Sequence, residues 1–480
     1  MKWQTLTVVA RQLLSLAVFA ALARLLDPAA FGLVGLVGVY LSFIMIFADQ
    51  GISTALIQRK ELTNEHLDTA FWFNLACSAA LALGTIAFAG RIAAFFGQPE
   101  LVPLLRWSSL ALVINAASAI HATLFVRDMD FRQPAIRALL ANVVGGIVGI
   151  AMALLGFGVW SLVGQQLASA SAGAVFLWSV SPYRPSFRFS PEKFRDLFNI
   201  SFSVFLTAIL WFLSTRLDQV VVGRFAGAVA LGLYVIAAKG PDLAQLLTHQ
   251  PMADVALPAL ARLQDNNAKM CKAIYDGMRL NALVSFALFI GLAAVAPNLI
   301  AALFGNRWAG AAAYCSLLCI CSLINVLQVF FHPALLASGG IGKYVLLNVC
   351  HVCGVLAACL IGIRFGVSQL IVGLIINGVV MTVPNVLFLK HRIGLSVVSF
   401  LRPCLVPAFA AALMALAVWW TPSLLSSSLA PGFRLLVQVP VGAAVYLGCI
   451  AILAPQAIRS LLNMAAHAFP AASLAPSPTT

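Results

Sequence analysis

Six charged side chains are predicted to lie at membrane depth in long apolar stretches of this sequence, and their types define the chemistry that the chain can carry out. They are Arg11, Asp49, Arg216, Asp218, Lys239 and Asp242, and His249 joins them as a titratable candidate. By insertion scales, a charged side chain costs about 2.5–3.5 kcal/mol at the centre of a lipid bilayer. Such groups are therefore expected to pair with one another, to face a water-filled cavity, or both.

The three cations among them are candidate substrate-binding residues. Arg and Lys bind phosphate groups well, so a cavity with fixed positive charge suits an anionic substrate. We therefore predict a cationic cavity lined by Arg11, Arg216 and Lys239. The other four residues are assigned to ion coupling or charge balance: Asp49, Asp218, Asp242 and His249. Among these four, Asp49 or His249 could carry a coupling proton.

Arg11 and Asp49 are expected at similar depth in the membrane. They flank a predicted turn near Pro28, and their distances from it agree within about 6 Å at the helical rise of 1.5 Å per residue. The sequence leaves two alternatives open for this pair. The two charges can join helices as an ion pair, or they can face the cavity, where Asp49 either balances Arg11 or titrates.

A second set of charges surrounds the next predicted hairpin. Asp218 and Lys239 agree in depth within about 5 Å, and Lys239 and Asp242 share one helical face because they are three residues apart. These residues too can be ion pairs or cavity groups. Gly240-Pro241 is expected to break or bend the helix between Lys239 and Asp242 and to free carbonyl groups there.

The composition shows what kind of element must position these residues. The chain has 480 residues, of which 62% are hydrophobic and only 9% charged, whereas soluble proteins carry about 25% charged residues. Runs of roughly 20 apolar residues, the length of a transmembrane helix, recur along the chain. The sequence therefore predicts an all-α polytopic membrane protein.

Fourteen transmembrane helices are predicted from the apolar runs. Their approximate ranges are 5–26, 31–57, 70–95, 103–126, 135–156, 158–180, 199–222, 229–250, 280–303, 312–336, 343–363, 367–389, 403–421 and 433–454. With the N-terminus placed in the cytoplasm, nineteen of the 29 Lys and Arg residues fall on inside segments and six on outside segments. This bias is the positive-inside pattern, so both termini are predicted to be cytoplasmic. The net charge of +14 is spread over the ends of apolar runs, which argues against nucleic-acid binding.

An internal repeat divides the chain. ARLLDPAAFGLVG at 23–35 aligns without gaps on GRFAGAVALGLYV at 223–235, and FGVWSL at 157–162 aligns on FGVSQL at 365–370. The offsets are 200 and 208 residues, and six predicted spans lie in each half. An even number of spans gives both halves the same orientation, which is a parallel repeat.

The predicted domains follow from this repeat. A six-helix lobe at 1–180 is joined by a cytoplasmic amphipathic linker at 181–198 to a second six-helix lobe at 199–392. Two extra transmembrane helices occupy 393–455, and a partly disordered cytoplasmic tail follows at 456–480.

Several blocks of the sequence resemble one family. FADQGISTALIQRKELTNEHLDTAFWFN is similar to the signature around the second and third spans of Wzx-type polysaccharide flippases, in the branch of the colanic-acid exporter. GFGVWSLVGQQ, YRPSFRFSPEKFRDLFNIS, LDQVVVGRFAGAVALGLY and LPALARLQDN resemble further blocks in the same order. These flippases belong to the multidrug/oligosaccharidyl-lipid/polysaccharide exporter superfamily, and the resemblance covers roughly residues 1–395.

The resemblance implies a fold, a cargo and partners. The two lobes would form a V that opens alternately to each side of the bacterial inner membrane. The cargo would be undecaprenyl-pyrophosphate-linked oligosaccharide, moved from the cytoplasmic to the periplasmic leaflet for exopolysaccharide or lipopolysaccharide biosynthesis. Membrane lipids, a polysaccharide polymerase and glycosyltransferases are the partners that fit this role.

Two other classes of protein remain as alternatives. A membrane polymerase or glycosyltransferase should have a sizeable outside loop or a soluble domain, and every predicted outside loop is short. An ion-coupled small-molecule antiporter of the same superfamily would favour a carboxylate-rich cavity, but the four Glu residues at 61, 65, 100 and 192 all lie outside the span cores. We therefore expect a transporter rather than an enzyme, with no catalytic residue, metal site or cofactor.

Overall fold

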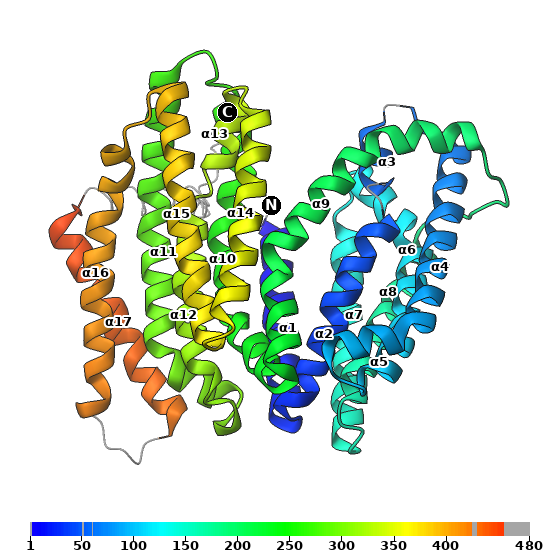
Figure 1. Ribbon diagram of the computed structural model, residues 1–480, viewed down its shortest axis with the longest axis horizontal. Coiled ribbons are helices and arrows are strands. Elements are labelled where there is room, and N and C mark those ends of the chain that lie inside the picture. Colours follow the sequence, from blue (N-terminus) through cyan, green and yellow to red (C-terminus); the bar gives the residue numbers. More distant parts are fainter. Residues whose placement is uncertain (1, 50–51, 60, 425–429, 456–480) are drawn as a thin grey trace, which may run out of the picture. The chain divides into compact units, whose positions relative to one another are not determined.

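The computed structural model describes residues 2–49, 52–59, 61–424 and 430–455, and these residues are helical nearly throughout. The elements are α1 (Lys2–Leu25), α2 (Pro28–Asp49), α3 (Ile52–Gln58), α4 (Asn64–Phe96), α5 (Leu101–Ser108), α6 (Leu110–Arg127), α7 (Arg132–Leu154), α8 (Trp160–Val180), α9 (Pro191–Phe225), α10 (Gly227–Ala261), α11 (Asn267–Leu303), the 3₁₀ turn η1 (Asn306–Trp308), α12 (Ala311–Leu327), α13 (Phe331–Ala337), α14 (Ile341–Gly362), α15 (Val367–Ile393), α16 (Val397–Leu424) and α17 (Pro431–Leu453). Figure 1 labels most of them.

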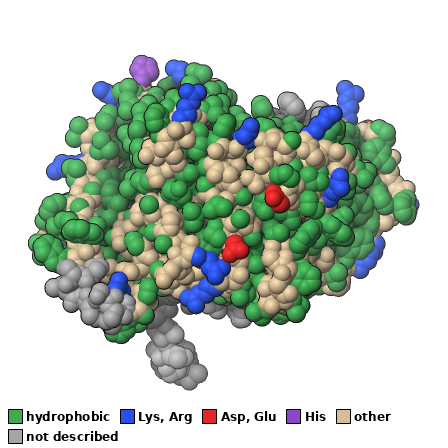
Figure 2. Space-filling view, turned by 60° about the horizontal axis from the view of Figure 1, so that its bottom comes forward, with side chains coloured by type: hydrophobic (Ala, Val, Ile, Leu, Met, Phe, Trp, Pro, Cys, Tyr) green, Lys and Arg blue, Asp and Glu red, His purple; other side chains and the backbone are tan. Residues whose placement is uncertain are grey.

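The all-α membrane fold predicted from the sequence is confirmed. Each of the fourteen predicted ranges falls on one of these helices or on two consecutive ones. Among the described residues, eleven spans are long and apolar enough to cross a membrane, so the count of fourteen stays a prediction. Many large apolar side chains point outward, including Leu83, Leu154, Trp419 and Ile452, each at least 67% exposed. The face drawn in Figure 2 is accordingly mostly hydrophobic, as a surface in contact with lipid tails must be.

The chain folds into two compact units. Unit 1 contains 1–236, 303–311 and 349–373, and unit 2 contains 237–302, 312–348 and 374–480. In unit 1, α7 and α8 pack along each other, α1 packs on α7, and α2 packs on α9. In unit 2, α16 and α17 pack together. The predicted lobes at 1–180 and 199–392 and the extra helices at 393–455 stay predictions, and the predicted tail, 456–480, lies outside the described residues.

The segment between α8 and α9 is held against α4 within unit 1. The carboxylate of Asp68 accepts hydrogen bonds from the Tyr183 hydroxyl (2.7 Å) and from the Ser186 amide (3.1 Å). The Trp72 indole donates to the Ser186 carbonyl (2.8 Å) and stacks on Phe187 at 4.6 Å. Burial, followed by the hydrogen bond and the charge of Asp68, raises the pKa of Tyr183, so the phenol remains a donor at neutral pH.

Helix α9 begins inside the range that the sequence assigns to the linker. Pro191 occupies the first turn, where its missing N–H costs nothing, and the Ser190 hydroxyl accepts from the Lys193 amide at 3.4 Å as an N-cap. From there α9 continues to Phe225 without interruption. Residues 191–198 are therefore continuous with the predicted seventh span, and only 181–190 are non-helical.

Helix α10 is also longer than expected. It runs from Gly227 to Ala261 through Pro241, Pro251 and Pro258, so Gly240-Pro241 does not break the helix, and the alternative expectation of a bend there stays a prediction. Proline is tolerated in membrane helices when neighbouring elements support the backbone. At this point α10 is well packed, because Pro241 is buried and a Cβ at Gly240 would lie 3.1 Å from Leu292 Cδ2 of α11.

Unit 2 is built around two apolar clusters. The first joins α10, α11, α13, α15 and α16 through buried residues such as Met270, Phe331, Leu389 and Phe400. The second holds α16 and α17 on α11, where the Tyr446 hydroxyl donates to the Leu283 carbonyl at 2.7 Å. The last two helices are thus an integral part of unit 2.

Candidate functional site

The turn between α1 and α2 lies at the end of unit 1 that the sequence predicts to face outside. Helix α1 ends at Leu25 and α2 begins at Pro28, so only Leu26 and Asp27 connect them. Pro28 fixes the backbone for the first helical position. This short connection brings the C-terminal end of α1 and the N-terminal end of α2 together as a rigid hairpin, on which two other segments of unit 1 pack.

The first of these segments is the start of α10, and it crosses α2 at very close range. A Cβ at Gly32 would lie 1.7 Å from the Ala228 carbonyl oxygen, and a Cβ at Gly232 would lie 2.0 Å from the Pro28 carbonyl oxygen. Only glycine fits at either position, because the atom in the way belongs to a backbone. We call this contact of Pro28, Gly32, Ala228 and Gly232 the glycine crossing.

The residues of the glycine crossing are equivalent to one another in the internal repeat. Residues 28 and 228 are equivalent at the offset of 200, and so are 32 and 232. The contact of Gly32 with Ala228 is therefore the counterpart of the contact of Gly232 with Pro28. A Cβ at Gly35 would lie 3.2 Å from Val235, its own equivalent residue. The first turns of α2 and α10 thus meet along residues that the sequence repeat aligns with one another.

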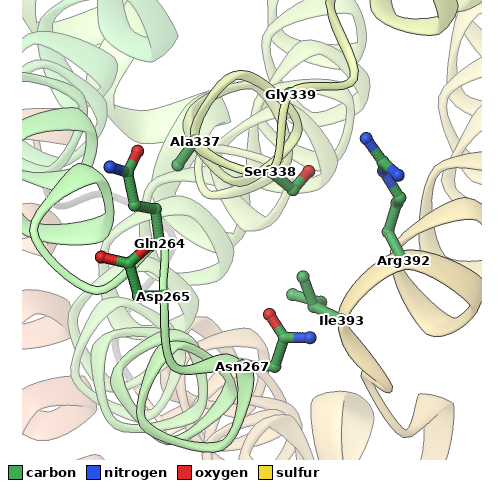
Figure 3. Close-up of a pocket in the computed structure, with 8 residues that line it drawn as sticks. All are labelled: Gln264, Asp265, Asn267, Ala337, Ser338, Gly339, Arg392 and Ile393. Atoms are coloured by element: carbon green, nitrogen blue, oxygen red, sulfur yellow. The ribbon is translucent and has the colours of Figure 1, made fainter.

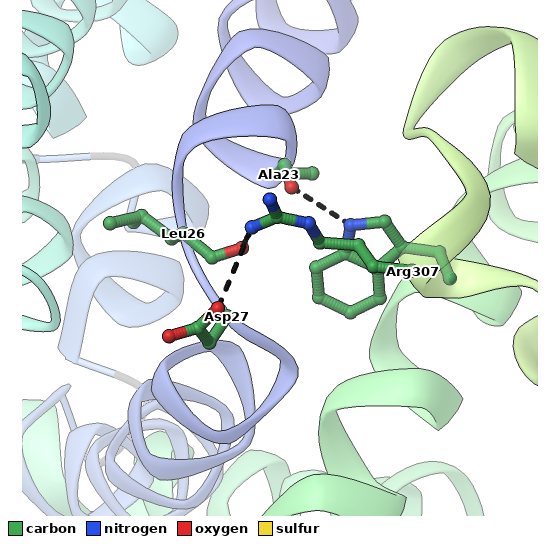
Figure 4. A network of polar contacts seen from close by, with 5 residues as sticks. Ala23, Leu26, Asp27 and Arg307 are labelled. Carbon is green, nitrogen blue, oxygen red and sulfur yellow. Dashed lines mark hydrogen bonds and ion pairs between the residues drawn. The ribbon is translucent and has the colours of Figure 1, made fainter.

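The second segment is 303–311, which connects α11 to α12 and belongs to unit 1. The Trp308 indole, which is fully buried, donates to the Ala23 carbonyl at 2.8 Å. The Arg24 Nε donates to the Leu303 carbonyl at 3.0 Å, and Arg307 Nη1 lies 3.5 Å from Asp27 Oδ1. Figure 4 shows Arg307 reaching across to Leu26 and Asp27 at the α1–α2 turn. We call this set the Trp308 contact.

Aromatic rings fill the interior of the Trp308 contact. Phe31 lies edge-on to Trp308 with ring centroids 5.4 Å apart, and Phe19 lies edge-on to Phe31 at 5.2 Å and to Phe304 at 5.9 Å. Edge-to-face pairs of this kind add about 0.5–1.5 kcal/mol each beyond the burial of area. By contrast, the Arg307–Asp27 pair is 48% and 84% exposed, so it contributes little. Apolar packing and the indole hydrogen bond dominate the contact.

In unit 1, one of the predicted charged residues, Asp218, has a hydrogen-bond donor that the sequence did not indicate. Asp218 of α9 accepts a hydrogen bond from the hydroxyl of Tyr234, which lies on α10 and is only 1% exposed. Its other oxygen, Oδ1, accepts from the Gln219 amide at 2.8 Å. Asp218 therefore ties α9 to α10. Arg11 on α1 and Arg216 on α9 are both half-buried.

Unit 2 holds the remaining predicted residues on α10. Lys239 and His249 are half-buried and Asp242 is exposed. Between them, the Gln245 amide donates to the Ser322 hydroxyl of α12 at 2.8 Å, a contact that sequence reasoning did not single out. Asp49 is the last residue of α2, and its side chain lies outside the described residues. The cationic cavity of Arg11, Arg216 and Lys239 stays a prediction.

The described part of the chain offers no group of three or more His, Cys, Asp or Glu side chains that could hold a metal ion.

Comparison with known proteins places the chain among polysaccharide biosynthesis proteins. Residues 21–313 match the family described as polysaccharide biosynthesis protein. The succinoglycan biosynthesis transport protein ExoT of Rhizobium meliloti (strain 1021) is 29% identical over 288 residues, which are 60% of this chain and 58% of that protein. The lipopolysaccharide biosynthesis protein WzxC of Escherichia coli (strain K12) is 26% identical, over 68% of this chain and 66% of the relative.

Two solved structures share the fold. The lipid II flippase MurJ in an inward closed conformation superposes with a TM-score of 0.78 at 15% identity, covering 95% of this chain and 100% of MurJ. An inward-facing multidrug resistance transporter of the MATE family, from the MOP superfamily, gives a TM-score of 0.63 at 18% identity, covering 80% and 94%. At these identities the likeness concerns the fold alone. Together with the family match, these findings confirm the resemblance that the sequence blocks indicated.

Proposed function

The chain belongs to the polysaccharide biosynthesis protein family, and we propose that it is a flippase for lipid-linked oligosaccharide. In this proposal, undecaprenyl-pyrophosphate-linked oligosaccharide moves from the cytoplasmic to the periplasmic leaflet of a bacterial inner membrane by alternating access. Family membership over more than half of the chain carries the proposal. The names of the relatives ExoT, a transport protein, and WzxC, a lipopolysaccharide biosynthesis protein, support it, and so does a fold shared with a lipid flippase.

The half-buried cations supply the binding chemistry in this proposal. A pyrophosphate must lose much of its hydration to cross the membrane, and cations held at membrane depth can replace that hydration. Arg11, Arg216 and Lys239 take this role. Asp49, Asp242 and His249 balance or couple charge. Asp218, whose carboxylate is hydrogen-bonded to Tyr234, holds α9 and α10 together beside Arg216.

The glycine crossing and the Trp308 contact close the outside end of unit 1 in this proposal. Backbone-to-backbone contact at Gly32 and Gly232 leaves no space for a sugar between α2 and α10. Segment 303–311 is short and is anchored by buried Trp308, so a movement of α11 and α12 must either carry this segment along or release it. Release of oligosaccharide to the outside requires that these contacts separate.

The test measures how much lipid-linked oligosaccharide accumulates in the cytoplasmic leaflet of a deletion strain. The strain is complemented with the wild-type protein or with variants. The variants are Arg11→Ala, Arg216→Ala, Lys239→Ala and Asp49→Asn, and Arg364→Ala is the matched control because Arg364 is exposed and lies beyond the predicted cavity. We expect oligosaccharide to accumulate in the cytoplasmic leaflet with the three cation variants at wild-type expression, and not with the control. Normal surface polysaccharide in the deletion strain, in the absence of a second exporter, would exclude this cargo.

A further inference from the structure

A polar pocket opens at one end of unit 2, within that unit alone. Its volume is about 350 Å³, and three chain segments line it: the connection between α10 and α11, the end of α13 and the end of α15. The lining residues are Gln264, Asp265, Asn267, Ala337, Ser338, Gly339, Arg392 and Ile393 (Figure 3). The positive-inside pattern of the sequence predicts that this end faces the cytoplasm.

Arg392 is the cation of the pocket, and its guanidinium is available for a ligand. Within the part of the chain that the structure describes, this guanidinium has no ion pair or hydrogen bond. In Figure 3, Ser338 and Asn267 extend towards the side of the pocket where Arg392 lies, whereas the carboxylate of Asp265 lies on the far side. The guanidinium, the hydroxyl and the carboxamide line one pocket, and each can donate a hydrogen bond to an anion.

The backbone at Gly339 shapes the wall beside Arg392. Gly339 has a φ of +75° and ends α13, with its amide donating to the Leu336 carbonyl at 3.1 Å and the Gly340 amide to the Leu335 carbonyl at 2.8 Å. A Cβ at Gly339 would lie 3.5 Å from Arg392 Nη2, so the guanidinium rests against this turn. Two residues later α14 begins, and the positive end of its dipole adds to the charge of Arg392.

The charged residues around the pocket favour an anionic ligand. The helix ends and connections at this end of unit 2 also carry exposed basic residues: Arg262, Lys269, Lys272, Lys343, Lys390 and Arg402. Acidic residues are few there, with Asp265 and Asp276 both exposed. Such an excess of positive charge attracts anionic groups at a membrane surface by about 1 kcal/mol per basic residue.

From these observations we propose that the pocket binds a phosphate group, with Arg392 as its charged ligand and Ser338 and Asn267 as hydrogen-bond donors. The source is either the phosphodiester of an anionic lipid headgroup or free phosphate, since the donors are the same for both. The site is separate from the predicted cavity residues and does not rest on the proposed transport activity.

The test is native mass spectrometry of the purified full-length protein with three probes: phosphatidylglycerol, phosphatidylethanolamine and inorganic phosphate. Arg392→Gln is compared with Arg402→Gln, a control that removes an exposed charge from the start of α16 without touching the pocket. We expect saturable binding of at least one anionic probe. It should weaken at least about tenfold in Arg392→Gln, because a charge-assisted hydrogen bond is lost, and less than about twofold in the control.

Each outcome bears on the proposal. Binding of phosphatidylglycerol that inorganic phosphate does not displace identifies a headgroup site, and displacement by millimolar phosphate identifies a site for free phosphate. An equal loss in Arg392→Gln and Arg402→Gln would show diffuse surface charge and overturn the proposal, as would the absence of saturable binding. Asn267→Ala is a second variant at the pocket, and unchanged unfolding midpoints of all variants show that the fold is retained.

Discussion

Replacing Gly32 with alanine tests the glycine crossing directly. The new Cβ would lie 1.7 Å from the Ala228 carbonyl oxygen, a clash that only a shift of one helix backbone can relieve. Overpacking of this kind costs about 1–3 kcal/mol. The alanine itself favours the helix by about 0.5–1 kcal/mol over glycine, so the net destabilisation is about 0–2.5 kcal/mol. The upper part of this range is expected here, because the obstructing atom is backbone. A loss of 2 kcal/mol lowers the ratio of folded to unfolded protein about 30-fold.

The same helix supplies the control. A Cβ at Gly38 would have no atom within 4 Å, so Gly38→Ala is expected to leave stability unchanged or to raise it by up to about 1 kcal/mol. The assay is equilibrium unfolding of the purified protein in mixed micelles, with helicity followed by circular dichroism. Gly232→Ala should behave as Gly32→Ala does, because its Cβ would lie 2.0 Å from the Pro28 carbonyl oxygen. Equal stabilities of Gly32→Ala and Gly38→Ala would refute the close crossing of α2 and α10.

The other predictions use the same unfolding assay. Trp308→Ala should destabilise the protein by about 3–5 kcal/mol because it empties a fully buried site. Trp308→Phe should lose mainly the indole hydrogen bond, about 0.5–1.5 kcal/mol. Equal losses of stability in the two variants would mean that the aromatic ring is not packed. Arg307→Gln should change stability by less than about 1 kcal/mol because its pair with Asp27 is exposed, and a larger loss would contradict that assignment. Tyr183→Phe should cost about 1.5–3 kcal/mol, because the Asp68 carboxylate loses a hydrogen bond. Since the pKa of Tyr183 is raised in the fold, this contribution is complete below the unfolded pKa of about 10 and declines only as the pH rises through the higher folded pKa. A wild-type advantage that varied between pH 6 and 9 would contradict the direction of the shift.

The sequence was sufficient to predict the helices. In an apolar run of membrane length, the backbone can satisfy its hydrogen bonds within the lipid only by forming a helix. It was less reliable where polar or proline residues interrupt a helix. Pro241 does not end α10, because buried packing against α11 supports that turn. Pro191 begins α9 inside the range assigned to the linker, because the first turn of a helix needs no proline N–H.

The repeat shows where sequence reasoning stops. Aligning Gly32 with Gly232 was possible from the sequence, but the direct contact of their two helices was not, since equivalent helices need not touch. Likewise, the sequence around Trp308 does not predict the hydrogen bond from its indole to the Ala23 carbonyl, because that bond depends on the tertiary position of segment 303–311. The hydrogen bond from Tyr234 to Asp218 was missed because Tyr234 reads as an ordinary apolar residue of α10. The charged candidate residues stand out in the sequence because charge at predicted membrane depth is rare, and their role stays a prediction.

Flippase activity is measured directly as transbilayer movement of a lipid-linked oligosaccharide in proteoliposomes. Vesicles that contain the purified protein are loaded with undecaprenyl-pyrophosphate-linked oligosaccharide, and the fraction of sugar reached by an external glycosidase is followed over time. With the wild-type protein we expect the accessible fraction of sugar to rise from about half towards all of it. With Arg11→Ala, Arg216→Ala or Lys239→Ala we expect this rise to be much slower. A fraction that stays at the level of protein-free vesicles, under every ion gradient applied, would contradict the proposed flippase activity.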